Sequence, residues 1–198
     1  DVIMVLAPNN PELHEELCEL PLKSGKPVYV DKTFAPDFET AKRIAETGKN
    51  AKFWSTSATR FEDSISEFLY NENSVVNGLS VSSGYQFEIY CIHLIEITNT
   101  FMKNGAEEVI FYSGAPAYKF EILYNDGRKA YINEFEGNAA PFTCFPEIDG
   151  KCKYIPFKGD FWKSFAKAVL DAHFDFKKMR KEYNSFPSKN LMGTLPGS

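Results

Sequence analysis

The sequence has no long apolar run, no excess of basic residues and no targeting pattern at its start. Its longest strongly apolar run, Val2–Ala7, is far shorter than the roughly 20 residues that a transmembrane helix needs. A charged segment followed by an apolar one, as in a secretory signal, is also absent. Lys and Arg number 22 against 27 Asp and Glu, and no basic cluster is interleaved with aromatic residues. We therefore expect neither a membrane nor a nucleic acid as a partner.

The cysteines form no Cys-x-x-Cys pair. Cys18, Cys91, Cys144 and Cys152 are scattered along the chain. This spacing does not fit a zinc site, and isolated thiols are typical of a reducing compartment. We expect a cytoplasmic protein with reduced cysteines and no metal; a Cys144–Cys152 disulfide is the alternative.

Aromatic residues, by contrast, are abundant. The 198 residues include 18 Phe and 10 Tyr, and 43% of the chain is hydrophobic. Because aromatic side chains bury large apolar areas, this composition predicts a substantial core or an apolar interface. The length allows one large domain or two small ones.

The first third of the sequence alternates between short apolar strands and helices. The expected strands are 2–6, 27–30 and 52–55, and the expected helices are 11–23 and 36–47. This β-α-β-α-β order predicts a parallel sheet with right-handed crossovers. The chain opens directly in the first strand, so we expect it to be a piece of something longer.

The first expected helix carries leucines at helical spacing. Leu13, Leu17 and Leu20 recur on one face and predict an amphipathic helix. His14 lies next to the first of them, and we expect it at the surface.

From about residue 60 the pattern changes. The stretch 85–102 is apolar almost all round and predicts a long buried helix. In 117–124 apolar and polar residues alternate, and Asn125-Asp126-Gly127 follows as a hairpin turn that leads into a strand at 129–135. These features predict an antiparallel sheet. The other expected elements of this part are a helix at 61–69, a strand at 107–113, a loop-rich segment at 136–159 and a final helix at 161–172.

Polar residues follow the first two strands. Ala7-Pro8-Asn9-Asn10 comes after the first strand, and Asp31-Lys32 comes directly after the second. Ligands of open parallel sheets bind at the carboxyl ends of the strands. A partly desolvated lysine there would have a lowered pKa and could act as a general acid or base in redox chemistry. The alternative is a lysine whose stem packs on the protein while its ammonium reaches solvent beside Asp31.

These motifs resemble the second half of the nucleotide-binding domain of the Gfo/Idh/MocA oxidoreductases. In that family a strand ends in a Pro-Asn loop, a helix follows, and a Gly-Lys-x-Val strand ends in Glu-Lys-Pro. Here Pro8-Asn9 matches the loop, Gly25-Lys26 matches the strand entry, and Asp31-Lys32-Thr33 stands where Glu-Lys-Pro is usual. The later elements resemble the family's substrate domain in architecture.

The resemblance implies an α/β fold followed by an α+β fold. Residues 1–58 would form the C-terminal part of a Rossmann-like domain with a partial parallel sheet. Residues 59–198 would form an α+β substrate and oligomerisation domain with an open, mainly antiparallel sheet.

The resemblance also implies hydride transfer between NAD or NADP and a sugar, cyclitol or related alcohol. Lys32 matches the family lysine that contacts the reacting oxygen, so it is the implied catalytic residue. Asp31 would help to hold the loop and the cofactor, and Pro8 and Asn9 would flank the nicotinamide.

A second candidate element lies in the long apolar helix. The family often has Asp-x-x-x-His-x-x-Asp there; His93 matches the histidine, as a second catalytic residue, and Glu96 replaces the last Asp. Ile89 stands at the first Asp position. Tyr90, three residues before His93, could offer a phenol, so Tyr90 and Glu96 are candidates for a proton relay. The alternative is a core histidine that bonds to Glu96.

The largest departure from the family is an absence. The twelve glycines include no Gly-x-Gly-x-x-Gly, the turn that holds a dinucleotide pyrophosphate. We therefore expect a fragment that binds NAD(P) weakly or not at all and is inactive alone. Thr33 in place of Pro and Ile89 in place of Asp favour an alternative: a non-catalytic binding or dimerisation module, a homo-oligomer through the Tyr- and Phe-rich sheet.

Overall fold

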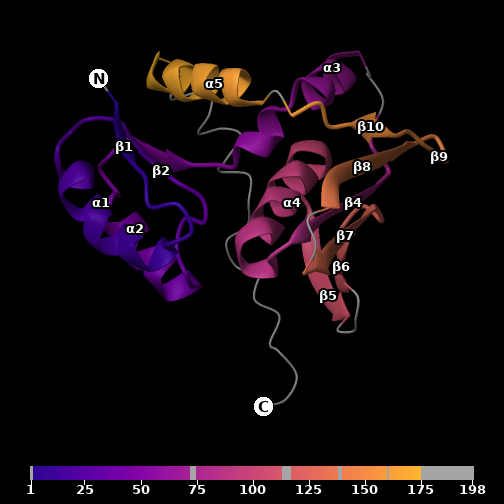
Figure 1. Cartoon of the computed structure of the whole chain (residues 1–198), viewed down its shortest axis with the longest axis horizontal. Helices are drawn as coiled ribbons and strands as arrows, with labels where there is room; N and C mark the ends of the chain where they lie inside the picture. The colour runs from indigo at the N-terminus through magenta and orange to yellow at the C-terminus, as the bar shows by residue number, and fades with distance from the viewer. Residues whose placement is uncertain (1, 72–74, 113–116, 138–139, 160, 175–198) are drawn as a thin grey trace. The chain divides into compact units, whose positions relative to one another are not determined.

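The computed structural model describes residues 2–71, 75–112, 117–137, 140–159 and 161–174, which form two compact units (Figure 1). The chain divides between Ala58 and Thr59. Helix α5 (Trp162–Phe174) belongs to the first unit, although the sequence analysis placed it in the domain 59–198. The second unit holds the described residues between Thr59 and Phe161.

The first unit contains a three-stranded parallel sheet in the order β1-β2-β3. Its strands are β1 (Ile3–Val5), β2 (Val28–Val30) and β3 (Phe53–Ser55). The connecting helices are α1 (His14–Lys23), preceded by a short 3-10 helix (Pro11–Leu13), and α2 (Phe38–Thr47). The predicted parallel β-α-β-α-β order is confirmed.

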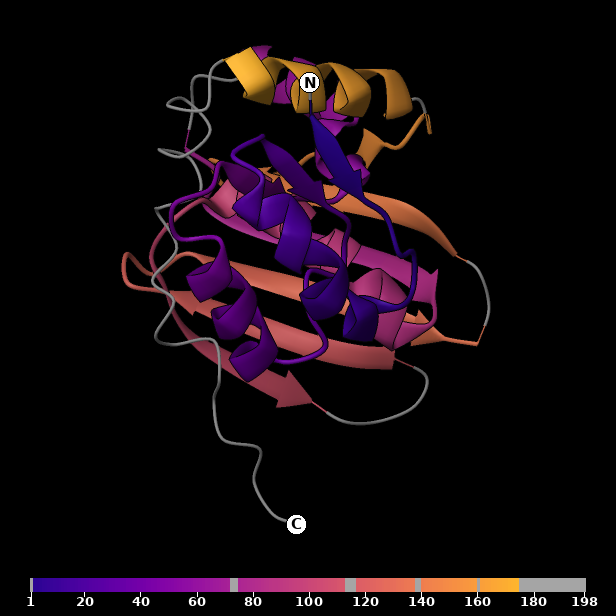
Figure 2. The ribbon, with the colours of Figure 1, turned by 90° about the vertical axis from the view of Figure 1, so that its left-hand side faces the viewer.

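Both faces of this small sheet are covered by helices. Val28 and Val30 are buried against α1 and α2, which lie side by side in Figure 2. Tyr29 points to the opposite face and packs edge-on against Phe165 of α5, with ring centroids 5.5 Å apart. Val169 of α5 is buried in the same cluster. This apolar contact is the physical reason why α5 belongs to the first unit.

Helix α1 buries a different face from the one that its leucines indicated. Leu13, Leu17 and Leu20 are exposed, whereas His14, Cys18 and Leu22 are buried. The buried residues also recur at helical spacing, one position along, and they face the sheet. The expectation of a surface His14 is therefore wrong, and the leucines whose spacing predicted the helix lie on its exposed side.

Helix α2 ends at Thr47 as expected and begins at Phe38, two residues later than expected, with Asp37 as its N-cap. The Asp37 carboxylate accepts hydrogen bonds from the Thr40 backbone N–H at 2.8 Å and from the Thr40 hydroxyl at 2.9 Å. Such an N-cap satisfies backbone donors that the first turn leaves free. Gly48 is the C-cap residue.

The second unit contains a seven-stranded sheet in the order β10-β8-β4-β7-β6-β5, with β9 paired to β8. The β4–β7 pair is parallel and the other pairs are antiparallel, which confirms the predicted open, mainly antiparallel sheet. Figure 2 shows the strands running side by side. The elements of this unit are α3 (Asp63–Asn71), β4 (Gly78–Tyr85), α4 (Phe87–Met102), β5 (Ala106–Tyr112), β6 (Ala117–Tyr124), β7 (Lys129–Glu136), β8 (Ala140–Ile148), β9 (Lys151–Cys152) and β10 (Ile155–Pro156).

Strand β8 lies in the segment 136–159 that was expected to be loop-rich. Pro141 and Pro146 disfavour a strand by local rules. The segment nevertheless pairs along β4, and its Cys144 and Ile148 are buried in the core. Long-range pairing and burial therefore outweigh the local signal.

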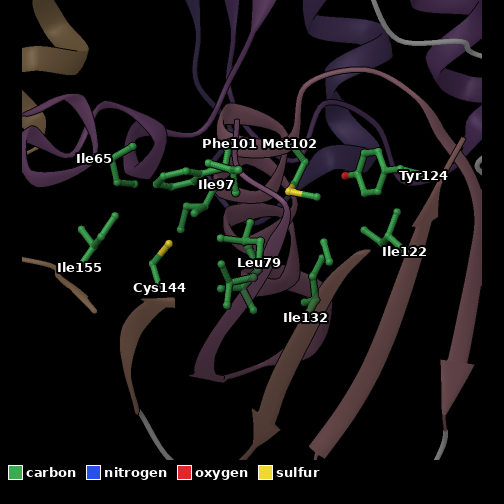
Figure 3. Packing of buried hydrophobic residues seen from close by; sticks show 14 of the residues in the cluster. Ile65, Leu79, Ile97, Phe101, Met102, Ile122, Tyr124, Ile132, Cys144 and Ile155 are labelled. Carbon is green, nitrogen blue, oxygen red and sulfur yellow. The ribbon is translucent and has the colours of Figure 1, made fainter. Parts of the chain in front are cut away.

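Helix α4 supplies one side of the core of the second unit. Ile97, Phe101 and Met102 of this helix pack against Leu79 and Ile132 of the sheet (Figure 3). The predicted buried character of this helix follows from these contacts.

Among the described residues, no helix is long and apolar enough to cross a membrane. All four cysteines are free thiols, so Cys144 and Cys152 do not form the alternative disulfide.

Two leucines of α1 provide a matched test of its buried face. Leu22 is 4% exposed and Leu20 is 79% exposed. We expect Leu22→Ala to lower the free energy of unfolding of the first unit by about 2–5 kcal/mol, because it leaves a cavity. Leu20→Ala should change it by less than about 0.5 kcal/mol. Urea unfolding can be followed by tryptophan fluorescence, since Trp54 and Trp162 both belong to this unit. Equal losses of unfolding free energy in the two variants would contradict the assignment of Leu22 to the buried face of α1 and of Leu20 to its exposed face.

Candidate functional site

The carboxyl ends of β1 and β2 bring three of the predicted site residues together. The Asp31 backbone N–H donates to the Val5 carbonyl at 3.0 Å, which holds the residue after β2 against the end of β1. Next in the chain, Lys32 places its Nζ 3.5 Å from the Asn9 Oδ1. Asn9, Asp31 and Lys32 therefore form one cluster at this edge of the sheet.

The Lys32 ammonium is partly buried. Burial lowers the pKa of Lys32, and the negative charge of Asp31 opposes this shift. The Asp31 Oδ1 accepts a hydrogen bond from the Tyr29 hydroxyl at 3.3 Å. A partly desolvated amine beside a carboxylate and an amide oxygen can take up or release a proton.

The loop after β1 orients Asn9 toward this lysine. Asn9 has a φ of 62°, in the left-handed region that asparagine tolerates better than most residues. The Asn10 backbone N–H donates to the Ala7 carbonyl at 3.0 Å and closes the turn. Pro8 is exposed in this turn, and its predicted contact with a cofactor stays a prediction. On the other segment, the Lys32–Thr33 peptide bond is cis.

His14 belongs to this region and was missed as a functional candidate. Its imidazole is 0% exposed, and its Nδ1 lies 3.1 Å from the Phe34 carbonyl oxygen. The available sequence signal was the spacing of four residues that separates His14 from Cys18 and Cys18 from Leu22.

The second unit carries the other predicted residues on α4. The Tyr90 ring packs edge-on against the His93 imidazole, with centroids 5.3 Å apart and an interplanar angle of 76°. Phe142 of β8 contacts the same imidazole edge-on at 5.7 Å. Tyr85, at the end of β4, packs against Tyr90 at 4.9 Å. His93 therefore lies among aromatic rings.

Glu96 forms an ion pair with an arginine. Its Oε2 accepts from the Arg60 Nη1 at 3.2 Å, and the two side chains are only 14% and 15% exposed. One carboxylate oxygen is therefore held by a guanidinium. Ile89, at the position where the family often has Asp, offers no acid.

Lys32 belongs to the first unit and His93 to the second, so each cluster is defined within its own unit. Across the described ranges, no group of three or more His, Cys, Asp or Glu side chains could hold a metal ion.

Solved structures share this fold, although no protein-family model and no curated protein matches the sequence. UDP-N-acetylglucosamine 3-dehydrogenase from Acidithiobacillus ferrooxidans has a TM-score of 0.72 at 12% identity, over 89% of this chain and 70% of its own. A Gfo/Idh/MocA family oxidoreductase from Vibrio cholerae has a TM-score of 0.62 at 11% identity, over 87% of this chain and 69% of its own. This chain has the Gfo/Idh/MocA fold.

A third structure with the Gfo/Idh/MocA fold contains a cofactor. GenD2 from gentamicin A biosynthesis, in complex with NAD, has a TM-score of 0.69 at 12% identity, over 89% of this chain and 69% of its own. At such identities the likeness concerns the fold, and function has to be argued from the site.

A buried carboxylate holds the end of β4, the strand that leads into α4. Glu134 of β7 is fully buried and accepts hydrogen bonds from the Ser83 hydroxyl at 2.6 Å and the Tyr85 backbone N–H at 3.2 Å. Burial raises the pKa of Glu134 above its ordinary value of 4.5. The residue thus ties β4 to β7 just before the helix that carries Tyr90 and His93.

The raised pKa of Glu134 predicts a pH-dependent stability. The folded state holds this proton more tightly than the unfolded state, so the stabilisation is complete below 4.5 and is lost as the pH rises through the folded-state pKa. We expect the unfolding free energy of the wild type to fall relative to that of Glu134→Gln over this window, in urea unfolding followed by circular dichroism. The exposed Glu108 provides the control Glu108→Gln. The unfolding free energy of this variant should change with pH in the same way as that of the wild type. Parallel profiles for the wild type and Glu134→Gln would contradict the prediction.

Proposed function

We propose that this chain is part of an oxidoreductase that transfers a hydride between NAD or NADP and a sugar, cyclitol or related alcohol. The observation that carries the proposal is the partly buried Lys32 ammonium at the carboxyl edge of the parallel sheet, beside Asn9 and Asp31. The Gfo/Idh/MocA fold supports it, because a structure with this fold contains NAD and another is a sugar-nucleotide dehydrogenase. Free cysteines favour a reducing, cytoplasmic setting.

Lys32 is proposed as the general acid and base. When bound, the nicotinamide accepts or supplies the hydride. In the oxidation direction, the neutral Nζ amine takes the proton of the substrate hydroxyl while the hydride leaves the adjacent carbon. In the reduction direction, the ammonium returns this proton to the oxygen of the carbonyl. A lowered pKa increases the fraction of the amine that can act as the base.

The cofactor is only partly accounted for by residues of this chain. Pro8, Asn9 and Asp31 lie where a nicotinamide would meet Lys32 in our proposal. The sequence has no glycine-rich turn to hold the pyrophosphate. We therefore propose that this chain binds NAD(P) weakly or not at all and is inactive by itself.

The exposed edge of β1 supports this fragment proposal. Within the described part of the first unit, β1 pairs with β2 alone. Met4 of this edge strand and Leu6 just after it are exposed, and so are Leu17 and Leu20 of the adjoining helix. Natural sheet edges usually carry charges, prolines or bulges that prevent further pairing. An apolar, unguarded edge is what a sheet shows where a further strand belongs.

His93 is proposed as the second catalytic residue. Tyr90 is the relay partner that its ring contact with the imidazole supports. Because the Arg60 guanidinium holds Glu96, we assign this carboxylate a supporting electrostatic role rather than direct proton transfer.

The alternative is a non-catalytic module that forms a homo-oligomer through the open sheet. Residues paired across the strands share a face, and one such row consists of Ile110, Glu121, Tyr131, Ser80 and Phe145. Three of its members are large and apolar or aromatic, and both Tyr131 and Phe145 are exposed.

The polar centre of this sheet face is internally satisfied. Glu121 accepts hydrogen bonds from the Tyr112 hydroxyl at 2.8 Å, the Lys129 Nζ at 2.9 Å and the Tyr131 hydroxyl at 3.3 Å. A carboxylate that is already paired can be covered by another surface at a smaller desolvation penalty than a free one. The face therefore suits a second copy of the chain, whether or not the protein is an enzyme.

The decisive test of the catalytic proposal is Lys32→Ala in the enzyme completed by its phosphate-binding segment. We expect kcat to fall by about 10²–10⁴, the usual contribution of a positioned acid or base, while the dissociation constant of the dinucleotide stays unchanged. Steady-state kinetics and a fluorescence titration measure the two quantities. The control is Lys26→Ala, which changes an exposed lysine just before β2.

Two outcomes would overturn parts of this proposal. Normal turnover of Lys32→Ala would remove Lys32 from the mechanism. Saturable binding of NADH or NADPH by the present chain alone would contradict the fragment proposal, and it would equally exclude a pure dimerisation module.

Light scattering tests the proposed oligomer. We expect a mass of about twice the 22.5 kDa of the chain and a return to the monomer mass in Tyr131→Glu, because a second carboxylate beside Glu121 would repel and remain unpaired on burial. The control is Tyr70→Glu, at an exposed position of α3 outside the sheet. A wild-type chain that stays monomeric at high concentration would contradict a dimer formed through this face of the sheet.

A further inference from the structure

We infer that His14 is a positioning residue: its buried imidazole fixes the segment that carries Lys32 relative to the segment that carries Asn9. The inference rests on the proposed function only in taking Lys32 as the reactive group. His14 itself, being fully buried, does not reach a substrate.

The hydrogen bond of His14 defines its tautomer. Its Nδ1 lies 3.1 Å from the Phe34 carbonyl oxygen. A carbonyl oxygen only accepts hydrogen bonds, so Nδ1 carries a hydrogen; in the neutral imidazole Nε2 is then the acceptor nitrogen. Among the described residues, Nε2 is buried without a hydrogen-bond partner.

This arrangement distinguishes His14 from an ordinary core residue. Burying an unpaired nitrogen is unfavourable, and an apolar ring of similar size would avoid it. The gain that histidine offers at this position is the single bond that Nδ1 makes to Phe34. The imidazole therefore acts as a specific tie between α1 and the β2–α2 connection.

The tie acts close to Lys32 on both segments. On the Lys32 side, Phe34 follows two residues later and its ring stacks on Phe53 of β3 at 6.0 Å. Before Lys32, the backbone of Asp31 is fixed to Val5. Lys32 thus lies between two anchored residues, and His14 holds the backbone carbonyl of the second one.

On the other side, His14 is the first residue of α1 and ends the connection that contains Asn9. The loop geometry at Asn9 and the start of α1 therefore move with the imidazole. The 3.5 Å separation of the Lys32 Nζ and the Asn9 Oδ1 is the distance that this tie would maintain. Loss of the tie should let Lys32 swing into water.

The test measures the pKa of Lys32 rather than turnover. The ε-amines of the present chain are labelled by reductive ¹³C-methylation, and Lys32 is assigned with Lys32→Arg. Burial lowers the pKa of Lys32 in the wild type. In His14→Phe, which keeps an aromatic ring but no donor, we expect this pKa to rise toward that of an exposed lysine. In His14→Asn, whose amide N–H can replace the Nδ1 donor, the lowered value should be restored at least in part.

A matched control separates positioning from general loosening of α1. Leu22→Ala weakens the buried face of the same helix, in the cluster against which the Phe34 ring also packs. It keeps both partners of the His14–Phe34 hydrogen bond, so it should leave the pKa of Lys32 where it is. An equal rise in Leu22→Ala, or no rise in a folded His14→Phe, would overturn the inference.

A second measurement uses the unmodified protein and does not depend on a variant that folds. Two-dimensional ¹H–¹⁵N spectra of the His14 ring should show a protonated, slowly exchanging Nδ1 and an unprotonated Nε2. The opposite tautomer would overturn the inference. None of these readouts needs catalysis, so a failure of the proposed oxidoreductase activity and a failure of the His14 inference are distinguishable.

Discussion

The parallel pairing of β1 with β2 places two loops at one edge of a sheet, and the candidate site depends on this constraint. The backbone bond from Asp31 to Val5 closes the pair just before Lys32. As a result, Lys32 lies beside Asn9, a residue 23 positions away in the chain. The lowered pKa of Lys32 is a consequence of the same packing, because burial of the lysine is its largest cause.

Buried polar side chains fix the segments that carry the candidate residues. His14 binds the connection after Lys32, and Glu134 binds the segment that leads into α4. Glu96, on the same helix as His93, forms an ion pair with Arg60. Each of these groups would be unfavourable inside the protein without its partner, so each specifies one local geometry rather than simply adding stability. Within each unit, the candidate residues are thus held in place by their neighbours.

The fold and the chemistry are separate conclusions. The Gfo/Idh/MocA fold is shared with solved structures at 11% to 12% identity, one of them a UDP-N-acetylglucosamine 3-dehydrogenase, and a shared fold by itself does not transfer an activity. The proposed hydride transfer therefore depends on Lys32 and its surroundings. The same sheet that completes the second unit also exposes an aromatic face, so catalysis and self-association can both use this architecture.

The sequence by itself determined the β-α-β-α-β order of the first unit and the placement of Lys32 directly after a buried strand, because both depend on neighbours along the chain. Alternating apolar segments and the Asn125-Asp126-Gly127 turn are local signals of this kind. Only the tertiary structure decided that His14 rather than Leu17 faces the sheet, that β8 pairs despite its prolines, and that α5 packs on the first unit. It also decided that Glu96 meets Arg60, 36 residues away. A periodic pattern indicates that a helix or strand forms. The face that this helix or strand buries depends on surfaces brought together from distant parts of the chain.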